Sequence, residues 1–304
     1  MMTHSVQRKR SSLMAALAVT LLLTAGCSAS QQPASAKPAA TTTPSDKSVA
    51  ASTPAPAAPT ATPAPANPPS SLDRSKPPGS NIDLSHWKLT LPLEKATDIS
   101  TADLVKGYSS DYFYTDPQDG AMTFWSPVVG GKTANTEYPR SELREMMNPS
   151  SSKVNWTWQG THIENAREMV TQVPSSGRVV VMQIHGITTA GGDAAPLVKV
   201  EYDDKKKAID CLVKSSSKTG DKDIHYTFNG YDLNKAYDGQ LKVVDGVLSM
   251  TFNGVTKTVN FVEQDPNWKT LNFYFKAGVY VQDNQGDKNE GGRVKIYKLD
   301  VSHS

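Results

Sequence analysis

The sequence predicts an all-β domain over residues 81–304, built as a sandwich or barrel of antiparallel strands. Beyond residue 81 the chain consists mostly of short alternating apolar and polar runs separated by Gly, Pro, Asn and Asp, a pattern typical of such folds. The pair Asn253-Gly254 lies between two β-favouring runs and indicates a tight hairpin, because both turn residues need positive φ. Helical patterns are short and few, so helices are expected only as connectors.

A segment of different character precedes this domain. In residues 1–26 a basic run at 8–10 is followed by an apolar stretch at 13–25, which has the layout of an export signal and is too short for a membrane span. The stretch ends at residues 23–27 (LTAGC), which resemble a bacterial lipoprotein cleavage box except at Thr24, where leucine is usual. The sequence therefore predicts lipidation of Cys27 and an outer-membrane lipoprotein that faces the periplasm or the medium. The alternative is ordinary signal cleavage and a secreted protein.

Residues 27–80 are predicted to be a disordered linker. They consist almost entirely of Ala, Pro, Ser and Thr and hold 12 of the 20 prolines, whereas the first aromatic residue of the chain is Trp87. Such a segment buries too little apolar surface to offset the entropy lost on ordering. We therefore expect a tether between the anchor and the domain.

Charge and cysteine content exclude other classes. The formal net charge of the chain is +2, but residues 81–304 hold 25 Lys and Arg against 28 Asp and Glu. Because a nucleic-acid-binding domain is usually basic, no nucleic-acid partner is predicted. With Cys27 lipidated, Cys211 has no partner for a disulfide, and it is expected as a small buried apolar residue.

The remaining elements follow from local pattern. Short helices are predicted at 98–106 and 232–237. Strands are predicted at 122–125, 154–158, 178–185, 197–202, 208–213, 224–228, 247–252, 255–261, 271–282 and 293–301.

Three segments, 140–144, 178–185 and 274–282, share an arrangement of polar residues. Because side chains of a strand alternate between its faces, each segment presents polar groups at every second position and apolar residues such as Leu143 and Ile184 on the opposite face. The residues assigned to the polar face are Arg140, Glu142, Arg144, Gln183, His185, Tyr274, Lys276, Gly278, Tyr280 and Gln282. A solvated face usually carries Lys, Glu, Thr and Ser, so the abundance of Arg, His, Tyr and Gln favours a functional surface.

These residue types suit a carboxylate-bearing sugar polymer as substrate. Arginine holds a carboxylate through two parallel hydrogen bonds, and His and Tyr exchange protons with a bound substrate. In a uronic acid, neutralising the carboxylate lets the negative charge of an enolate-like transition state spread onto it. A base then removes the C5 proton, an acid protonates the departing O4 oxygen, and the chain breaks by β-elimination.

The three segments also carry a family resemblance. Residues 140–144 (RSELR), 183–185 (QIH) and 274–282 (YFKAGVYVQ) resemble the signature segments of the alginate lyases of polysaccharide lyase family seven, in the family's order. The one departure is Val281, where many members have asparagine, and alternation assigns Val281 to the core face. The resemblance implies a β-jelly roll of two antiparallel sheets with a concave substrate groove. It further implies an endo-type, monomeric alginate lyase that leaves 4,5-unsaturated uronates and needs no cofactor.

Residue roles follow from the same resemblance. Arg140 and Gln183 would neutralise the uronate carboxylate, with His185 assisting there or acting as base toward guluronate. Tyr280 would be the acid, and also the base toward mannuronate. Glu142, Arg144, Lys276, Tyr274 and Gln282 would bind and position substrate or tune Tyr280. No metal is implied, and the six His show no zinc-type spacing.

Two other functions remain open at this point. A noncatalytic jelly roll that binds acidic polysaccharide would use the same groove, with Trp156 and Trp158 as stacking residues, although both are better explained as core or edge residues. A glycoside hydrolase would need two carboxylic acids beside the scissile bond, and Glu142 is the only acid in the three segments.

Overall fold

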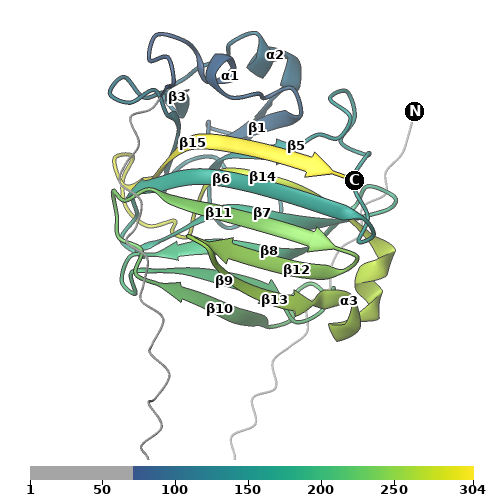
Figure 1. Ribbon diagram of the computed structural model, residues 1–304. Coiled ribbons are helices and arrows are strands. Elements are labelled where there is room, and N and C mark those ends of the chain that lie inside the picture. Colours follow the sequence, from purple (N-terminus) through teal and green to yellow (C-terminus); the bar gives the residue numbers. More distant parts are fainter. Residues whose placement is uncertain (1–70) are drawn as a thin grey trace, which may run out of the picture. The chain divides into compact units, whose positions relative to one another are not determined.

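The computed structural model describes residues 71–304, which form two antiparallel sheets stacked face to face (Figure 1). The short helices are α1 (Pro78–Asn81), α2 (Thr101–Val105), α3 (Phe261–Gln264) and the 3-10 helix η1 (Pro266–Thr270). The strands are β1 (Trp87–Leu91), β2 (Thr97–Ile99), β3 (Phe113–Thr115), β4 (Met122–Pro127), β5 (Arg140–Glu145), β6 (Thr161–Gln172), β7 (Arg178–Thr188), β8 (Asp193–Asp203), β9 (Ala208–Lys214), β10 (Asp223–Asn229), β11 (Tyr237–Val244), β12 (Val247–Phe252), β13 (Val255–Asn260), β14 (Leu271–Val281) and β15 (Gly291–His303). The all-β prediction is confirmed.

The strand order brings distant parts of the chain together. One sheet has eight strands in the order β10-β9-β8-β7-β14-β5-β1-β2, and the other has seven in the order β13-β12-β11-β6-β15-β4-β3. The three segments with alternating polar residues therefore lie on neighbouring strands, β7, β14 and β5, in the middle of the eight-stranded sheet. Among the described residues, no helix is long and apolar enough to cross a membrane.

All but one of the predicted strands are present, and the exception is 154–158. That segment is a loop that touches the sheet through an isolated bridge between Trp156 and Phe273. The helix predicted at 232–237 is also wrong, because Asn234 adopts a left-handed φ of 61° and β11 begins at Tyr237. The helix predicted at 98–106 is reduced to α2, which Ser100 caps by accepting a hydrogen bond from the Asp103 amide.

Two hairpins show why the seven-stranded sheet folds at this register. Asn253 and Gly254 have φ of 47° and 82°, as the predicted turn requires, and Phe252 pairs with Val255 across it. The turn between β11 and β12 has the same pair of positive φ angles, 45° at Asp245 and 83° at Gly246. This Asp-Gly pair is a hairpin signal that the sequence predictions missed, together with β11 itself.

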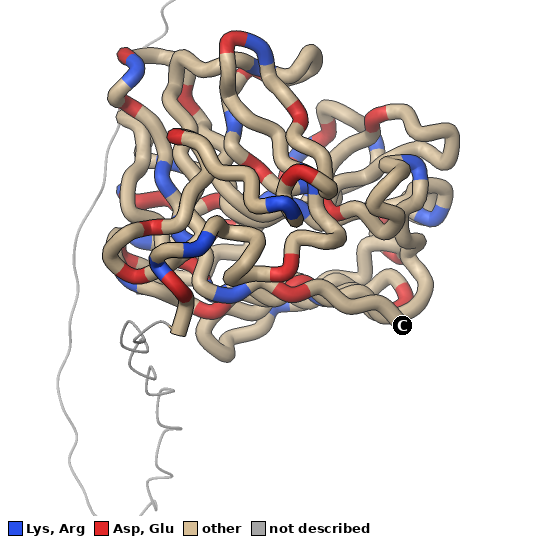
Figure 2. Tube along the Cα trace, turned by 90° about the horizontal axis from the view of Figure 1, so that it is seen from above, with Lys and Arg blue, Asp and Glu red and all other residues tan. Residues whose placement is uncertain are grey.

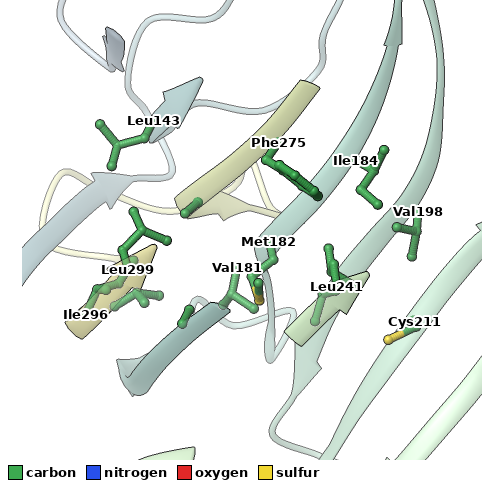
Figure 3. Packing of buried hydrophobic residues seen from close by; sticks show 14 of the residues in the cluster. Leu143, Val181, Met182, Ile184, Val198, Cys211, Leu241, Phe275, Ile296 and Leu299 are labelled. Atoms are coloured by element: carbon green, nitrogen blue, oxygen red, sulfur yellow. The ribbon is translucent and has the colours of Figure 1, made fainter. Parts of the chain in front are cut away.

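The core lies between the two sheets. Leu143, Phe275 and Ile184 point inward from β5, β14 and β7, toward Leu241 and Ile296 of the opposite sheet (Figure 3). Each of these side chains is fully buried, which stabilises the sandwich by about 1.5–3 kcal/mol per residue. Cys211 is also buried in this core, as predicted. The apolar half of each alternating segment therefore fixes the direction in which the polar half points.

A buried polar network joins the sheets at one end of the sandwich. The Glu145 carboxylate, at the end of β5, accepts hydrogen bonds from the Trp156 indole at 3.0 Å and from the Phe275 amide at 2.9 Å. Its other oxygen lies 2.6 Å from Nε2 of His303, on β15 of the opposite sheet. His303 in turn contacts His162 on β6 through their Nδ1 atoms, which are 2.9 Å apart. The network ties the C-terminal strand to β5 and β14.

Candidate active site

A groove of about 740 Å³ runs across the outer face of the eight-stranded sheet. Its lining extends from β1 and β2, with Lys88 and Asp98, to β9 and the loop that follows it, with Lys214 and Gly220. The predicted site residues that line it are Arg140, Arg144, Gln183, His185, Tyr274, Lys276, Tyr280 and Gln282. The face predicted from alternation is thus a single concave surface.

Strand register places these residues side by side. On β14, Lys276 pairs with Arg144 of β5 and with Gln183 of β7, while Tyr280 pairs with Arg140. Beyond Ala277 the ladder between β14 and β7 slips by one residue, whereas the ladder with β5 continues unbroken. This β-bulge keeps Tyr280 beside Arg140 on the groove face.

Glu142 lies beneath the groove lining. Its side chain is 1% exposed, and its carboxylate contacts Lys276 Nζ, Arg140 Nη1 at 3.0 Å and Gln183 Nε2 at 2.5 Å. Burial opposes ionisation, but the Lys276 ammonium and the Arg140 guanidinium hold the pKa of Glu142 below its usual value. Glu142 therefore positions three other site residues from behind and does not face the substrate space.

The same contacts fix the orientation of the Gln183 amide. A carboxylate only accepts hydrogen bonds, so the amide nitrogen of Gln183 faces Glu142. The second N–H and the carbonyl oxygen of that amide remain for other partners.

Burial lowers the pKa of Lys276 to about 8, with the negative charge of Glu142 acting in the opposite direction.

Tyr280 lies under the guanidinium of Arg140. The Arg140 Cζ atom is 3.8 Å from the centre of the Tyr280 ring, and Nε of Arg140 is buried without a hydrogen-bond partner. Burial raises the pKa of Tyr280, although the Arg140 charge partly offsets this. The phenol is therefore protonated at neutral pH and has a proton to donate.

His185 is a neutral imidazole held in one tautomer. Its Nδ1 lies 2.9 Å from the carbonyl oxygen of Gly186, which only accepts, so Nδ1 carries the hydrogen and Nε2 keeps its lone pair. Burial, together with the positive charge of Lys276, lowers the pKa of His185 to about 4. The ring stacks on Tyr274, with centroids 5.4 Å apart. A neutral histidine of this kind can act as a base.

The guanidinium of Arg144 serves mainly the structure. It donates to the Glu145 carbonyl at 2.5 Å, the Ser152 carbonyl at 2.8 Å and the Asn155 side chain at 2.7 Å, and it covers the Tyr274 ring at 4.0 Å. Arg144 thus anchors the loop after β5 and holds Tyr274 in place. Gln282, which directly follows β14, donates to the Val281 carbonyl at 2.9 Å.

The groove also contains residues that the sequence predictions missed. Lys88 of β1 bonds Asp98 of β2 at 2.6 Å, and at the opposite end Lys214 lies 2.7 Å from Asp223. The signal for β1 was present, because residues 87–91 (WKLTL) alternate strictly and are buried at every second position. The two rims, 133–138 and 193–196, come from loops and strand ends that carry no such period.

The tryptophans proposed for a binding module lie elsewhere. Trp156 is 2% exposed and bonds Glu145 on the core side of β5, as its core assignment predicted. Trp158 packs against the core with Lys269 over its ring.

Within residues 71–304 no cluster of His, Cys, Asp or Glu is arranged to hold a metal ion.

Comparison with known proteins gives one consistent family. The family described as alginate lyase matches residues 82–303. An alginate lyase of Klebsiella pneumoniae is 24% identical over 285 residues, which cover 74% of this chain and 91% of that protein. The matched region is the part of the chain that holds both sheets and the groove.

Solved structures agree with this match. Alginate lyase A1-II', a member of polysaccharide lyase family 7, is 52% identical with a TM-score of 0.72, over 75% of this chain and 98% of that one. An alginate lyase of Pseudomonas aeruginosa is 37% identical with a TM-score of 0.67, over 73% and 100% of the two chains. A variant of A1-II' with one histidine changed to asparagine and one tyrosine to phenylalanine is in complex with a substrate, GGMG, at 51% identity, a TM-score of 0.73 and coverage of 76% and 97%. The predicted jelly-roll fold is confirmed by these relatives.

Proposed function

Because this chain belongs to the alginate lyases of polysaccharide lyase family seven, we propose that it cleaves 1,4-glycosidic bonds within alginate at the groove formed by β5, β14 and β7. Its activity is that of an alginate lyase, and the noncatalytic alternative is not supported. Cleavage within the chain is favoured by the length of the groove, whose lining crosses the sheet from β2 to β9.

Arg140 and Gln183 neutralise the uronate carboxylate in this proposal. Both lie on the groove and both are held by Glu142, at 3.0 Å and 2.5 Å, so their remaining N–H groups are oriented before substrate arrives. Donors that are already in place stabilise the negative charge that develops on the carboxylate when C5 loses its proton. Lys276 adds positive charge from the neighbouring position on β14.

His185 and Tyr280 divide the proton transfers toward guluronate. The lone pair on Nε2 of His185 takes the C5 proton, and the electron pair of that bond forms the C4–C5 double bond. The bond between C4 and O4 breaks, and O4 receives the proton of the Tyr280 hydroxyl. Toward mannuronate, Tyr280 acts as both base and acid.

One observation carries the proposal. The groove combines an uncharged histidine, whose pKa is lowered to about 4, with a protonated tyrosine on the neighbouring strand. A proton acceptor and a proton donor are thus present at neutral pH beside two carboxylate-binding groups. A binding module has no need for this combination.

The test is to incubate the purified protein with alginate and to follow the ultraviolet absorbance of unsaturated uronates. Rising absorbance with an early fall in viscosity is expected for elimination within the chain. Absorbance without a viscosity drop would indicate release from chain ends, and a flat trace would refute the lyase. Mass spectrometry of the products excludes hydrolysis if no water has been added.

We also propose export and attachment of the enzyme to the outer membrane through a lipid on Cys27. The support is the basic and apolar layout of residues 8–25 followed by Cys27, and all of these positions lie outside the described residues. A lipid mass on Cys27, with processing blocked by globomycin, is the expected result. A mature N-terminus without lipid would instead indicate a secreted enzyme.

A further inference from the structure

An acidic side chain, that of Asp193, lies near Nδ1 of His185. Asp193 is the first residue of β8 and pairs with Ile187 on β7. The turn between them is closed by two hydrogen bonds of 2.8 Å, from the Thr188 amide to the Gly192 carbonyl and from the Gly192 amide to the Thr188 hydroxyl. This turn brings Oδ1 of Asp193 to 3.9 Å from Nδ1 of His185.

The electrostatic surroundings of His185 oppose its protonation. The ring is partly buried, with 17% of the side chain exposed, Lys276 and Arg140 face it with positive charge, and the uncharged Tyr274 ring covers one side. Asp193 carries the opposite charge and favours the protonated form. A base that receives a proton between two cations needs such a compensating charge.

We propose that Asp193 is a positioning residue of the reaction, which stabilises the imidazolium formed when His185 accepts the C5 proton. This inference rests on the proposed function of the groove. The Nδ1–H of His185 donates to the Gly186 carbonyl at 2.9 Å, and the Asp193 carboxylate adds its charge on the same side of the ring. Nε2 remains directed away from both acceptors and free to meet substrate.

The proton balance of the step is complete without another reactant. C5 loses a proton to Nε2 of His185, the C4–C5 double bond forms, and O4 leaves with the proton of Tyr280. The imidazolium and the tyrosinate that result exchange one proton through solvent, which restores both groups. Asp193 keeps its charge throughout and acts only on the energy of the imidazolium.

The test is the variant Asp193→Asn, which removes the charge and keeps the shape. Proton NMR titration of the His185 ring, assigned by the signal missing in His185→Gln, should show a pKa lower by roughly half a unit. The kcat on guluronate blocks should fall about threefold or more, because the imidazolium loses stabilisation. Asp193→Glu should recover part of both values.

The matched control is Asp238→Asn. Asp238 lies on the seven-stranded sheet, where it pairs with Arg167. Its side chain is 60% exposed and that of Asp193 is 61% exposed, so the two substitutions remove equally accessible charges. The control should leave the His185 titration and the kcat unchanged. An Asp193→Asn variant in which His185 titrates as in the wild type would overturn the proposal. Absence of ultraviolet absorbance with the wild-type enzyme would instead refute the lyase function on which it rests.

Discussion

At the scale of single residues, this site depends on a charge that substrate does not reach. Glu142 is 1% exposed and contacts Arg140, Lys276 and Gln183 from beneath the groove lining, on the same face of the sheet. Removing one partner of a buried pair leaves the other charge without compensation, which costs about 3–5 kcal/mol. The carboxylate therefore maintains the spacing of the groups that bind the uronate.

The variant Glu142→Gln tests this role. We expect kcat/KM to fall roughly 100-fold, because the groups that bind the carboxylate shift, and the melting temperature to fall as well. The measurement is the initial rate on alginate together with thermal unfolding. Glu201→Gln is the control, since Glu201 is buried on the same sheet at 3.5 Å from Arg178 and should leave kcat unchanged. Wild-type kcat/KM in Glu142→Gln would contradict the positioning role.

Tyr280→Phe tests the proton donor. The change removes one hydroxyl and keeps the ring under Arg140, so the fold should be retained while kcat falls by 100-fold or more, as is typical for loss of a general acid. Circular dichroism and initial rates give the two readouts. Tyr114→Phe, on β3 of the opposite sheet, should behave as the wild type. Turnover of Tyr280→Phe at the wild-type rate would show that another group protonates O4.

At the scale of elements, the bulge in β14 places Tyr280 beside Arg140 on the groove face. Gly278 has φ of 137°, and a Cβ placed there would lie 2.6 Å from the Ser141 carbonyl oxygen and 2.9 Å from Cα of Glu142. No other residue fits this approach of β14 to β5 without moving one of the strands. The glycine is therefore required by the geometry of the site as well as by its own backbone.

Gly278→Ala should separate β14 from β5 and shift Tyr280. We expect a loss of about 2 kcal/mol in the free energy of unfolding and a large loss of kcat, measured by denaturant titration and initial rates. Gly230→Ala controls for backbone strain, because Gly230 also has positive φ but has open space around its Cβ position. Equal effects of the two substitutions would mean that the close approach is unimportant.

The strands that the sequence predicted differ from those it missed in the kind of residue they bury. β5, β7 and β14 have polar residues on one face and apolar residues on the other, so the sequence shows their two-residue period. β6 has the same period, but its inward positions include His162, Glu164 and Glu168, which contradict the apolar pattern of a core strand. Residues 154–158 alternate tryptophans without forming a strand, since Trp156 reaches the core from a loop. The rim residue Asp193 has no local signal, because its meeting with His185 depends on strand pairing.

At the scale of the whole molecule, positive charge is local and paired. Basic and acidic residues are interspersed along the trace (Figure 2), as the small net charge of the domain implies. In the groove, Lys88 lies against Asp98, Lys276 against Glu142, and Lys214 near Asp223. Each of these three lysines is thus held in place by an acid, so the groove presents fixed donors to a polyanion without a large basic surface.

The stability of the whole sandwich should depend on pH through buried carboxyls. Burial raises the pKa of Glu168 to about 8, and burial with the neighbouring Glu145 raises that of Glu164 well above its usual range. A carboxyl whose pKa is raised by folding stabilises the fold fully below its unfolded pKa, and this contribution is lost as pH rises through the folded value. The melting temperature should therefore decline from mildly acidic pH to above about pH 8.

Glu168→Gln isolates this effect. An amide does not ionise, so the decline of melting temperature with pH should become shallower, while Glu263→Gln, at an exposed position of α3, should leave it unchanged. Differential scanning calorimetry across that pH range supplies the measurement. A slope in Glu168→Gln that equals the wild-type slope would assign the pH dependence to other groups.

The bond between Glu145 and His303 also sets an order of events in folding. The two residues are 158 positions apart, and β5 is synthesised long before β15. The strand that carries Arg140 and Glu142 therefore lacks this hydrogen bond to the opposite sheet until the C-terminal strand has docked. Contacts of such long range form late and slowly. We therefore expect catalytic competence to be acquired late in folding, and a chain interrupted before β15 to have the residues of a lyase without their alignment.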